Sequence, residues 1–224
     1  MRASGGTLRR LLCSLVLVCV ASGAQAQVDY PALHRVARVA PDDVLHVRAG
    51  PSADAEIVGS LAPDAVVEVV ATVAGRPGWG MVNTGERWGH ASLRFLDPLP
   101  VAGPRAPLPI VQCFGAEPFW DLRLESGAMT LRDLAPGRTL EVVDLEAPVV
   151  SIRDGRTEVR QGAGPWGRMT LVARVPEAPI QGAEPGRLCA DGMSDRFHGI
   201  EATLLVEDEG GTSVLVGCCA QGLP

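Results

Sequence analysis

The chain has 224 residues, of which 46% are hydrophobic, and its 20 basic residues face 26 acidic ones for a formal charge of −6. All 20 basic residues are arginine, and they form no basic stripe along the sequence. Because an acidic surface repels phosphate backbones, we expect no nucleic-acid partner.

Residues 1–26 have the organisation of a secretory signal peptide. Arg2, Arg9 and Arg10 precede an apolar run over residues 11–20, and small residues follow up to Ala26. A run of this length is shorter than the roughly 20 residues that a membrane-spanning helix needs. We expect cleavage near Ala26, giving a periplasmic or secreted protein with no stable membrane span. A lipid anchor and an uncleaved anchor are the alternatives. Cleavage removes three arginines and no acidic residue, so the formal charge changes from −6 to −9.

The rest of the chain is predicted to be all-β. Its apolar runs are short, rich in β-branched residues and separated by turn-forming residues, a pattern typical of sandwiches and barrels. Residues 98–109 hold five prolines and no strand or helix pattern, which indicates a linker. We therefore expect a domain over 34–98, a Pro-rich linker over 99–109 and a second domain over 110–224.

Residues 37–98 resemble the bacterial SH3-like (SH3b) domain. The resemblance rests on residues 45–52 (Leu-His-Val-Arg-Ala-Gly-Pro-Ser), on residues 57–61 (Ile-Val-Gly-Ser-Leu), on Gly78-Trp79 and on Trp88. It implies a small barrel that binds cell-wall peptides or envelope proteins and is rarely catalytic. The sequence Arg-Trp-Gly-His around Trp88 departs from the Gly-Trp-Val of the family, and this departure affects the strand beside any ligand groove.

Three residues of this first domain are candidates for ligand binding. Trp79 and Trp88 are either aromatic groove walls or buried barrel residues. Arg48 either contacts a ligand or donates hydrogen bonds to carbonyl groups of its own loop.

The cysteines predict two disulfides in the second domain. Six cysteines become four after cleavage, and an even number in an exported chain indicates disulfide pairing. Cys218 and Cys219 are adjacent and point to opposite faces of a strand, so a bond between them is strained. Two pairings remain, and in both Cys113 and Cys189 are joined to the C-terminal strand.

Two motifs of the second domain resemble bacterial envelope domains of unknown function. They are residues 113–120 (Cys-Phe-Gly-Ala-Glu-Pro-Phe-Trp) and residues 189–195 (Cys-Ala-Asp-Gly-Met-Ser-Asp). The resemblance implies no established activity. Where the family often has a Tyr-Pro step, this chain has Phe197-His198-Gly199.

Four residues of these motifs are candidate binding residues. Pro118 is expected to keep the chain extended into a strand that carries Trp120. Glu117, beside two aromatic residues, is expected to be a buried structural carboxylate or a site residue, with a pKa raised by desolvation. Asp191 and Asp195 belong either to a tight turn with capped backbone donors or to a ligand or cation loop. The spacing matches no calcium-loop template.

The sequence favours a non-catalytic binding protein over an enzyme. Asp191, Ser194 and His198 are close in sequence, but no Gly-x-Ser-x-Gly elbow accompanies them. We expect no cofactor and no metal site, because nucleotide motifs and Cys-x-x-Cys are missing from the sequence. The alternatives are an envelope enzyme or redox protein, and a small-ligand barrel with an apolar cavity lined by Phe119, Trp120 and Phe197.

Overall fold

The structure is a computed structural model, and it describes residues 29–103, 105–125, 127–133, 137–153, 156–176 and 188–223. The expected signal peptide lies outside these residues. The described part of the chain folds as antiparallel β-structure with one short 3₁₀ turn, which confirms the predicted all-β fold. No helix in this part is long and apolar enough to cross a bilayer.

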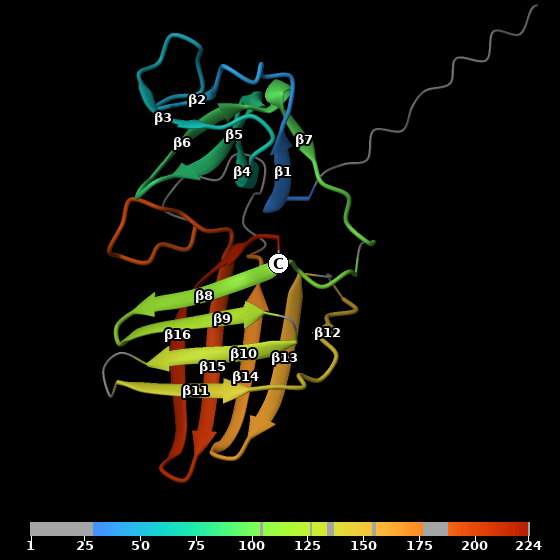
Figure 1. Cartoon of the computed structure of the whole chain (residues 1–224), viewed down its shortest axis with the longest axis vertical. Helices are drawn as coiled ribbons and strands as arrows, with labels where there is room; N and C mark the ends of the chain where they lie inside the picture. The colour runs from blue at the N-terminus through green and yellow to red at the C-terminus, as the bar shows by residue number, and fades with distance from the viewer. Residues whose placement is uncertain are drawn as a thin grey trace, which may run out of the picture.

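The N-terminal sheet has seven strands in the order β3-β2-β6-β5-β4-β1-β7 (Figure 1, upper half). Alternate residues of these strands point to one face, so Val47, Val69, Val82 and Ala91 share a buried core. The elements are β1 (Ala32–Val36), β2 (Leu45–Arg48), β3 (Ile57–Leu61), β4 (Val66–Val73), β5 (Arg76–Thr84), β6 (Arg87–Ser92), the 3₁₀ turn η1 (Leu93–Phe95) and β7 (Leu96–Pro98).

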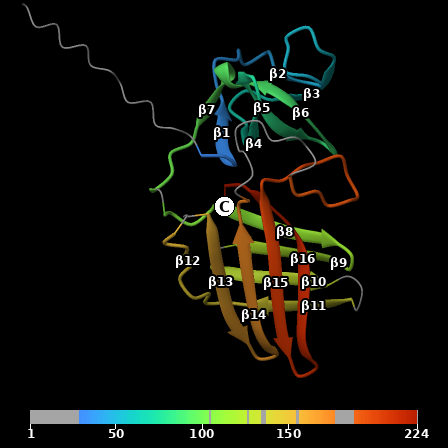
Figure 2. The same cartoon turned by 180° about the vertical axis from the view of Figure 1, so that it is seen from behind.

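The C-terminal sheet has nine strands in the order β11-β10-β9-β8-β16-β15-β14-β13-β12. It curls so that the layer β8 to β11 lies across the layer β13 to β16, as the front and back views show (Figures 1 and 2). The strands are β8 (Ile110–Ala116), β9 (Phe119–Glu125), β10 (Ala128–Asp133), β11 (Arg138–Val142), β12 (Val149–Val150), β13 (Thr157–Gly164), β14 (Gly167–Arg174), β15 (Ile200–Asp208) and β16 (Gly211–Gln221).

The core of the C-terminal domain fills the space between its two layers. On β9, Trp120, Leu122 and Leu124 alternate with exposed or half-buried residues, and on β15 Leu204 does the same. The indole Nε1 of Trp120 donates to the carbonyl oxygen of Val216 at 3.2 Å, which satisfies its one buried donor. Trp120, a candidate binding residue, is therefore part of the core.

Two disulfides join distant segments of the C-terminal domain. Cys113 on β8 is bonded to Cys219 on β16, and Cys189 is bonded to Cys218. This is one of the two pairings that the sequence leaves open. Disulfides persist in oxidising compartments, so the pairing indicates a non-cytoplasmic location.

A buried ion pair attaches the end of the Pro-rich segment to the C-terminal sheet. The carboxylate of Glu158, which is 1% exposed, accepts from the backbone N–H of Leu108 at 2.6 Å and from Nε of Arg160 at 2.7 Å. Arg160 Nη2 in turn donates to the Leu108 carbonyl oxygen at 2.6 Å. The three groups satisfy one another, so the chain enters β8 at a fixed position.

We predict that Glu158→Ala lowers the free energy of unfolding by about 3–5 kcal/mol, because it leaves the partly buried Arg160 without its counter-ion. Denaturant unfolding of the mature chain measures the loss. Glu201→Ala, at an exposed position of β15, is the matched control. A loss below about 1 kcal/mol contradicts the anchoring role of Glu158.

Candidate functional site

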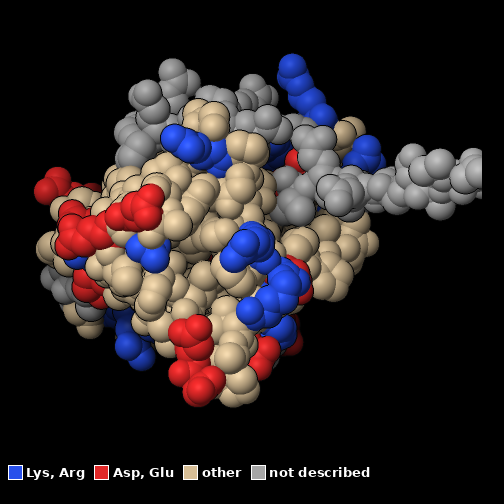
Figure 3. Space-filling model, turned by 90° about the horizontal axis from the view of Figure 1, so that it is seen from above, with Lys and Arg blue, Asp and Glu red and all other residues tan. Residues whose placement is uncertain are grey.

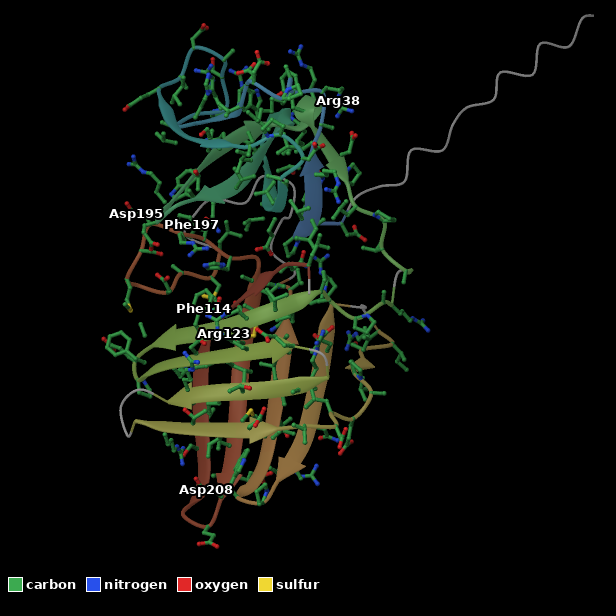
Figure 4. The ribbon with its side chains drawn as sticks, in the orientation of Figure 1. Arg38, Phe114, Arg123, Asp195, Phe197 and Asp208 are labelled. Atoms are coloured by element: carbon green, nitrogen blue, oxygen red, sulfur yellow. A yellow bond between two sulfur atoms is a disulfide. The ribbon has the colours of Figure 1, made fainter. Side chains whose placement is uncertain are left out.

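The candidate site lies between the two sheets, where residues 188–199 pack against the N-terminal domain (Figure 4). We call residues 188–199 the junction loop. Val69, Val82 and Ala91 point into the N-terminal core, so their strand neighbours point to the opposite face. We call this opposite side of β4, β5 and β6 the outer face. Its side chains are Glu68, Val70, Met81, Asn83, Trp88 and His90.

The junction loop is closed by covalent and backbone bonds at its base. The disulfide to Cys218 fixes Cys189 against β16. The backbone N–H of Cys189 donates to the His198 carbonyl oxygen at 2.9 Å, and the N–H of His198 donates to the Cys189 carbonyl oxygen at 2.8 Å. Cys189 and His198 are therefore held together beside β16.

Asp191 organises the turn within the loop. Its Oδ1 accepts from the backbone N–H groups of Met193 and Ser194, both at 2.9 Å, and its Oδ2 accepts from the Ser194 hydroxyl at 2.9 Å. Partial burial acts to raise the pKa of Asp191, but these hydrogen bonds outweigh it and hold the pKa below its usual value. Gly192 has φ of 72°, which a glycine adopts without strain. The carboxylate thus serves as an internal cap in the described structure.

The loop pairs with the N-terminal domain as a short extended segment. The N–H of Asp195 donates to the Glu86 carbonyl oxygen at 2.9 Å, and the N–H of Trp88 donates to the Asp195 carbonyl oxygen at 3.1 Å. The Asn83 side chain donates to the Phe197 carbonyl oxygen at 2.7 Å and accepts from the Phe197 N–H at 3.2 Å. The rings of Trp88 and Phe197 meet edge to face at 5.6 Å. Asp195 therefore pairs with the edge of β6 at its first residues, and the Phe197 ring packs against Trp88 on the outer face.

Ionisable groups are buried beside this pairing. His198 is 1% exposed, and its ring lies edge-on to Phe114 at 4.8 Å. Burial, assisted by the charge of Arg196, lowers the pKa of His198 to about 4. Burial raises the pKa of Glu68 to about 8, although the Gln221 backbone and Arg196 act in the opposite direction. Both groups are therefore uncharged at neutral pH, which reduces the cost of burying them.

Close backbone approach brings the two domains together at a second point. A Cβ added at Gly199 falls 2.8 Å from the ring of Pro31, so only glycine fits there without displacement. The Gln221 side chain donates to the Pro31 carbonyl oxygen at 3.3 Å. The start of β1 and the end of β16 are thus in direct contact.

The structure brings together some of the predicted site residues and separates others. Trp88, Asp191 and Asp195 all belong to the junction. Trp79 is half-buried on the same outer face, but it pairs with Ser92, whereas Trp88 pairs with Asn83. Arg48 pairs with His90 and donates to the Ala55 carbonyl oxygen at 2.7 Å, a bond within its own loop.

Of the two alternatives for Glu117, a buried structural carboxylate or a site residue, the first is wrong. Glu117 is exposed, because Glu117 and Pro118 form the turn of the β8–β9 hairpin instead of an extended entry to a strand. Phe119 is 47% exposed while Trp120 is in the core, since neighbours in a strand face opposite sides. With Phe197 at the junction, these aromatic residues do not line one cavity.

The residues of the sequence-level catalytic alternatives do not form a nucleophile–base pair in the described structure. The Ser194 hydroxyl donates to Asp191, and neither ring nitrogen of His198 has a hydrogen-bond partner among the described residues, so Ser194 and His198 do not form a nucleophile–base pair. All four cysteines of the C-terminal domain are in disulfides, which removes the thiolate alternative. In the part of the chain that the structure describes, His, Cys, Asp and Glu form no group of three that could hold a metal ion.

Sequence reasoning missed Asn83 and Glu68. Glu68 interrupts the apolar run Val-Val-Glu-Val-Val, and a charged residue in a buried strand is a signal for a special environment. Asn83 is the single asparagine of the chain, but nothing local to it indicates a partner that is 114 residues away.

Comparison of the chain with protein-family models gives no match, and comparison with curated proteins gives none either.

We predict that Asn83→Ala loosens the junction by about 1–3 kcal/mol, because the N–H and the carbonyl group of Phe197 both lose their partner. Hydrogen exchange at the amides of residues 195–198 should accelerate by one to two orders of magnitude. Gln161→Ala, which removes an exposed side-chain hydrogen bond to Glu146, is the control. Unchanged exchange at these amides contradicts the role given to Asn83.

We predict that Glu68→Gln stabilises the protein increasingly as the pH rises. The pKa of Glu68 is raised on folding from 4.5 to about 8, so the folded state holds a proton that the unfolded state has lost, and stability falls as the pH rises between these values. The difference in free energy of unfolding between variant and wild type should grow by up to about 1.4 kcal/mol per pH unit between pH 5 and 8. His198 is present in both proteins, so its own titration cancels.

Denaturant unfolding at several pH values provides the measurement. Glu56→Gln, at an exposed position, is the control for the loss of one negative charge. If the Glu68→Gln and wild-type stability curves run parallel over this pH range, Glu68 is not held protonated by the junction.

Proposed function

We propose that the protein is an exported, non-catalytic binding protein of the cell envelope. In this proposal the N-terminal domain is an SH3-like module that recognises an extended peptide, either a cell-wall peptide or a segment of an envelope protein. The signal-like residues 1–26, the Val-Arg-Ala-Gly-Pro-Ser sequence at 47–52 and the two disulfides support this assignment.

The observation that carries the proposal is the pairing of residues 195–197 with the β5–β6 hairpin. The edge of β6 at its first residues holds an extended chain through the backbone of Glu86 and Trp88, and the side-chain amide of Asn83 on β5 holds Phe197. Backbone pairing of this kind is a general mode of peptide recognition, with neighbouring aromatic residues giving selectivity. The junction loop is therefore an internal example of the ligand class that we propose.

The outer face continues along the β5–β6 hairpin from the junction to Trp79. In the β5–β6 hairpin, the pairs Asn83–Trp88, Met81–His90 and Trp79–Ser92 follow one another on the outer face, with Asn83–Trp88 at the junction and Trp79 at the other end. Exposed Arg76 is on the same strand, and the guanidinium of Arg94 lies 4.5 Å from the centre of the Phe95 ring in the adjoining 3₁₀ turn. The view from above, onto the N-terminal domain from the side away from the C-terminal sheet, shows basic and acidic side chains with uncharged surface between them (Figure 3). A half-buried tryptophan on a sheet face is suited to packing against a side chain of a short peptide.

We predict that the mature chain, residues 27–224, binds peptides released from purified sacculi and that Trp79→Ala weakens this binding at least tenfold. Changes in tryptophan fluorescence and in NMR amide shifts of β5 and β6 measure the affinity. Trp166→Ala, at a half-buried tryptophan of the C-terminal domain, is the matched control and should leave peptide binding unchanged. Trp79→Phe, which keeps an aromatic ring, should retain part of the affinity.

Two results decide between the forms of the proposal. If sacculi do not retain the mature chain and released peptides do not bind, the cell-wall form is wrong. A photo-crosslinker at the exposed position 78, which keeps Trp79, then tests the envelope-protein form, and absence of a crosslink to any envelope protein overturns it as well.

A further inference from the structure

A groove of about 700 Å³ lies in the C-terminal domain at the end away from the junction. The labelled Asp208 marks this end in Figure 4, far from Asp195 and Phe197. The β15–β16 turn forms one side of the groove, and β11 and the β13–β14 turn form the other. Its lining residues are Arg138, Leu140, Trp166 and residues 208–213.

Trp166 forms a fixed aromatic surface on one side of this groove. It is half-buried, and its indole Nε1 donates to the Glu141 carbonyl oxygen at 2.9 Å, so the ring is tied to β11. A Cβ at Gly164 falls 2.7 Å from this nitrogen and 2.9 Å from the Glu141 oxygen. Any side chain at position 164 would clash with the indole ring, so glycine at this position allows Trp166 to pack there.

An ordered ion pair faces the groove beside the ring. Arg138 Nη1 and Asp208 Oδ2 are 2.6 Å apart, and Oδ1 of Asp208 accepts from the Gly210 N–H at 2.8 Å. These hydrogen bonds, with that from Arg138 the stronger, lower the pKa of Asp208, so its carboxylate stays ionised. The two side chains are 32% and 24% exposed, so each keeps part of its surface toward the groove.

A second glycine, Gly167, allows the β13–β14 turn to lie close to the end of β15. A Cβ at Gly167 falls 1.9 Å from the Glu207 carbonyl oxygen, which no other residue could accommodate without moving the strands. Gly167 pairs with Asp208, so this contact places the Trp166 turn directly beside the ion pair. The groove is thus built from a fixed ring, a fixed ion pair and the exposed hydroxyl groups of Thr212 and Ser213.

The chemistry of this lining matches a carbohydrate better than the other common ligands. Sugar rings present an apolar face of C–H groups, which stacks on an indole, and a rim of hydroxyl groups that both donate and accept. Arg138 supplies donors and Asp208 supplies acceptors in fixed positions. Asp208 pairs with the single arginine of the lining, and Glu209 adds a second acidic residue to the groove, which disfavours an anionic ligand.

We propose that this groove binds a neutral saccharide, with Trp166 as the stacking surface and with Arg138 and Asp208 as the groups that hold the hydroxyls. The site is separate from the outer face of the N-terminal domain, so it does not depend on the proposed peptide binding.

Titration of the mature chain, residues 27–224, with the tetramer of β-1,4-linked N-acetylglucosamine tests the proposal. Saturable quenching of tryptophan fluorescence and NMR shifts at residues 138–141, 164–168 and 208–213 are the expected results. Trp166→Ala should lower the affinity at least tenfold, Asp208→Asn should lower it severalfold, and Trp79→Ala should leave it unchanged. Maltotetraose, a neutral sugar with a different linkage, tests whether the groove selects among glycans.

Shifts confined to the outer face, or binding that Trp166→Ala leaves unchanged, overturn the proposal. Absence of saturable binding to both sugars also overturns it. Circular dichroism and the conservative variant Trp166→Phe separate loss of the ligand surface from loss of the fold. Since the peptide titration and the sugar titration use different probes, failure of one leaves the result of the other intact.

Discussion

Cys218 and Cys219 are adjacent on β16, and successive side chains of a strand point to opposite faces of the sheet. Their disulfides therefore act on opposite sides of the same strand. Cys219 points into the core and is bonded to Cys113 on β8. This disulfide links β8 and β16, the two neighbouring strands between which the curled sheet passes from one layer to the other. Cys218 points outward and holds the base of the junction loop. Cys219 thus stabilises the fold of the C-terminal domain, and Cys218, on the opposite face of the same strand, stabilises the loop that attaches the N-terminal domain.

The attachment combines strong backbone pairing with polar groups that are costly to bury. Asp195 and Phe197 satisfy their backbone groups on the N-terminal domain, while Glu68 and His198 are buried beside them in their uncharged forms. A wholly apolar contact would fix less firmly which residue of the loop pairs with which residue of the N-terminal domain, because the hydrophobic effect is not directional. The backbone pairs and the Asn83 amide fix which residues meet, and the buried polar groups penalise any other arrangement.

The elements with strong local signals could be predicted from the sequence, and the contacts between distant segments could not. Short β-branched runs predict an all-β protein, and adjacent cysteines reduce three disulfide pairings to two, because both conclusions depend on strand geometry alone. Glu117 was misplaced because a Glu-Pro pair fits a hairpin turn as well as an extended entry. Trp120 and Trp88 both lie near the start of a strand, yet one is in a core and the other faces the junction loop. That difference depends on which segment covers each strand, and a single sequence does not encode it locally.

The two proposed binding surfaces lie at opposite ends of a body whose parts are tied together. The outer face of the N-terminal domain is on one side of the junction, and the Trp166 groove is at the far end of the C-terminal sheet. Cell walls contain peptide and glycan in one covalent polymer, so a ligand held at one end raises the effective concentration of the other component at the second end. A flexible link between the domains would weaken this gain, because it spreads the second site over many positions. The junction loop, with its disulfide, its backbone pairs and the Asn83 amide, provides the rigidity that such two-point binding needs.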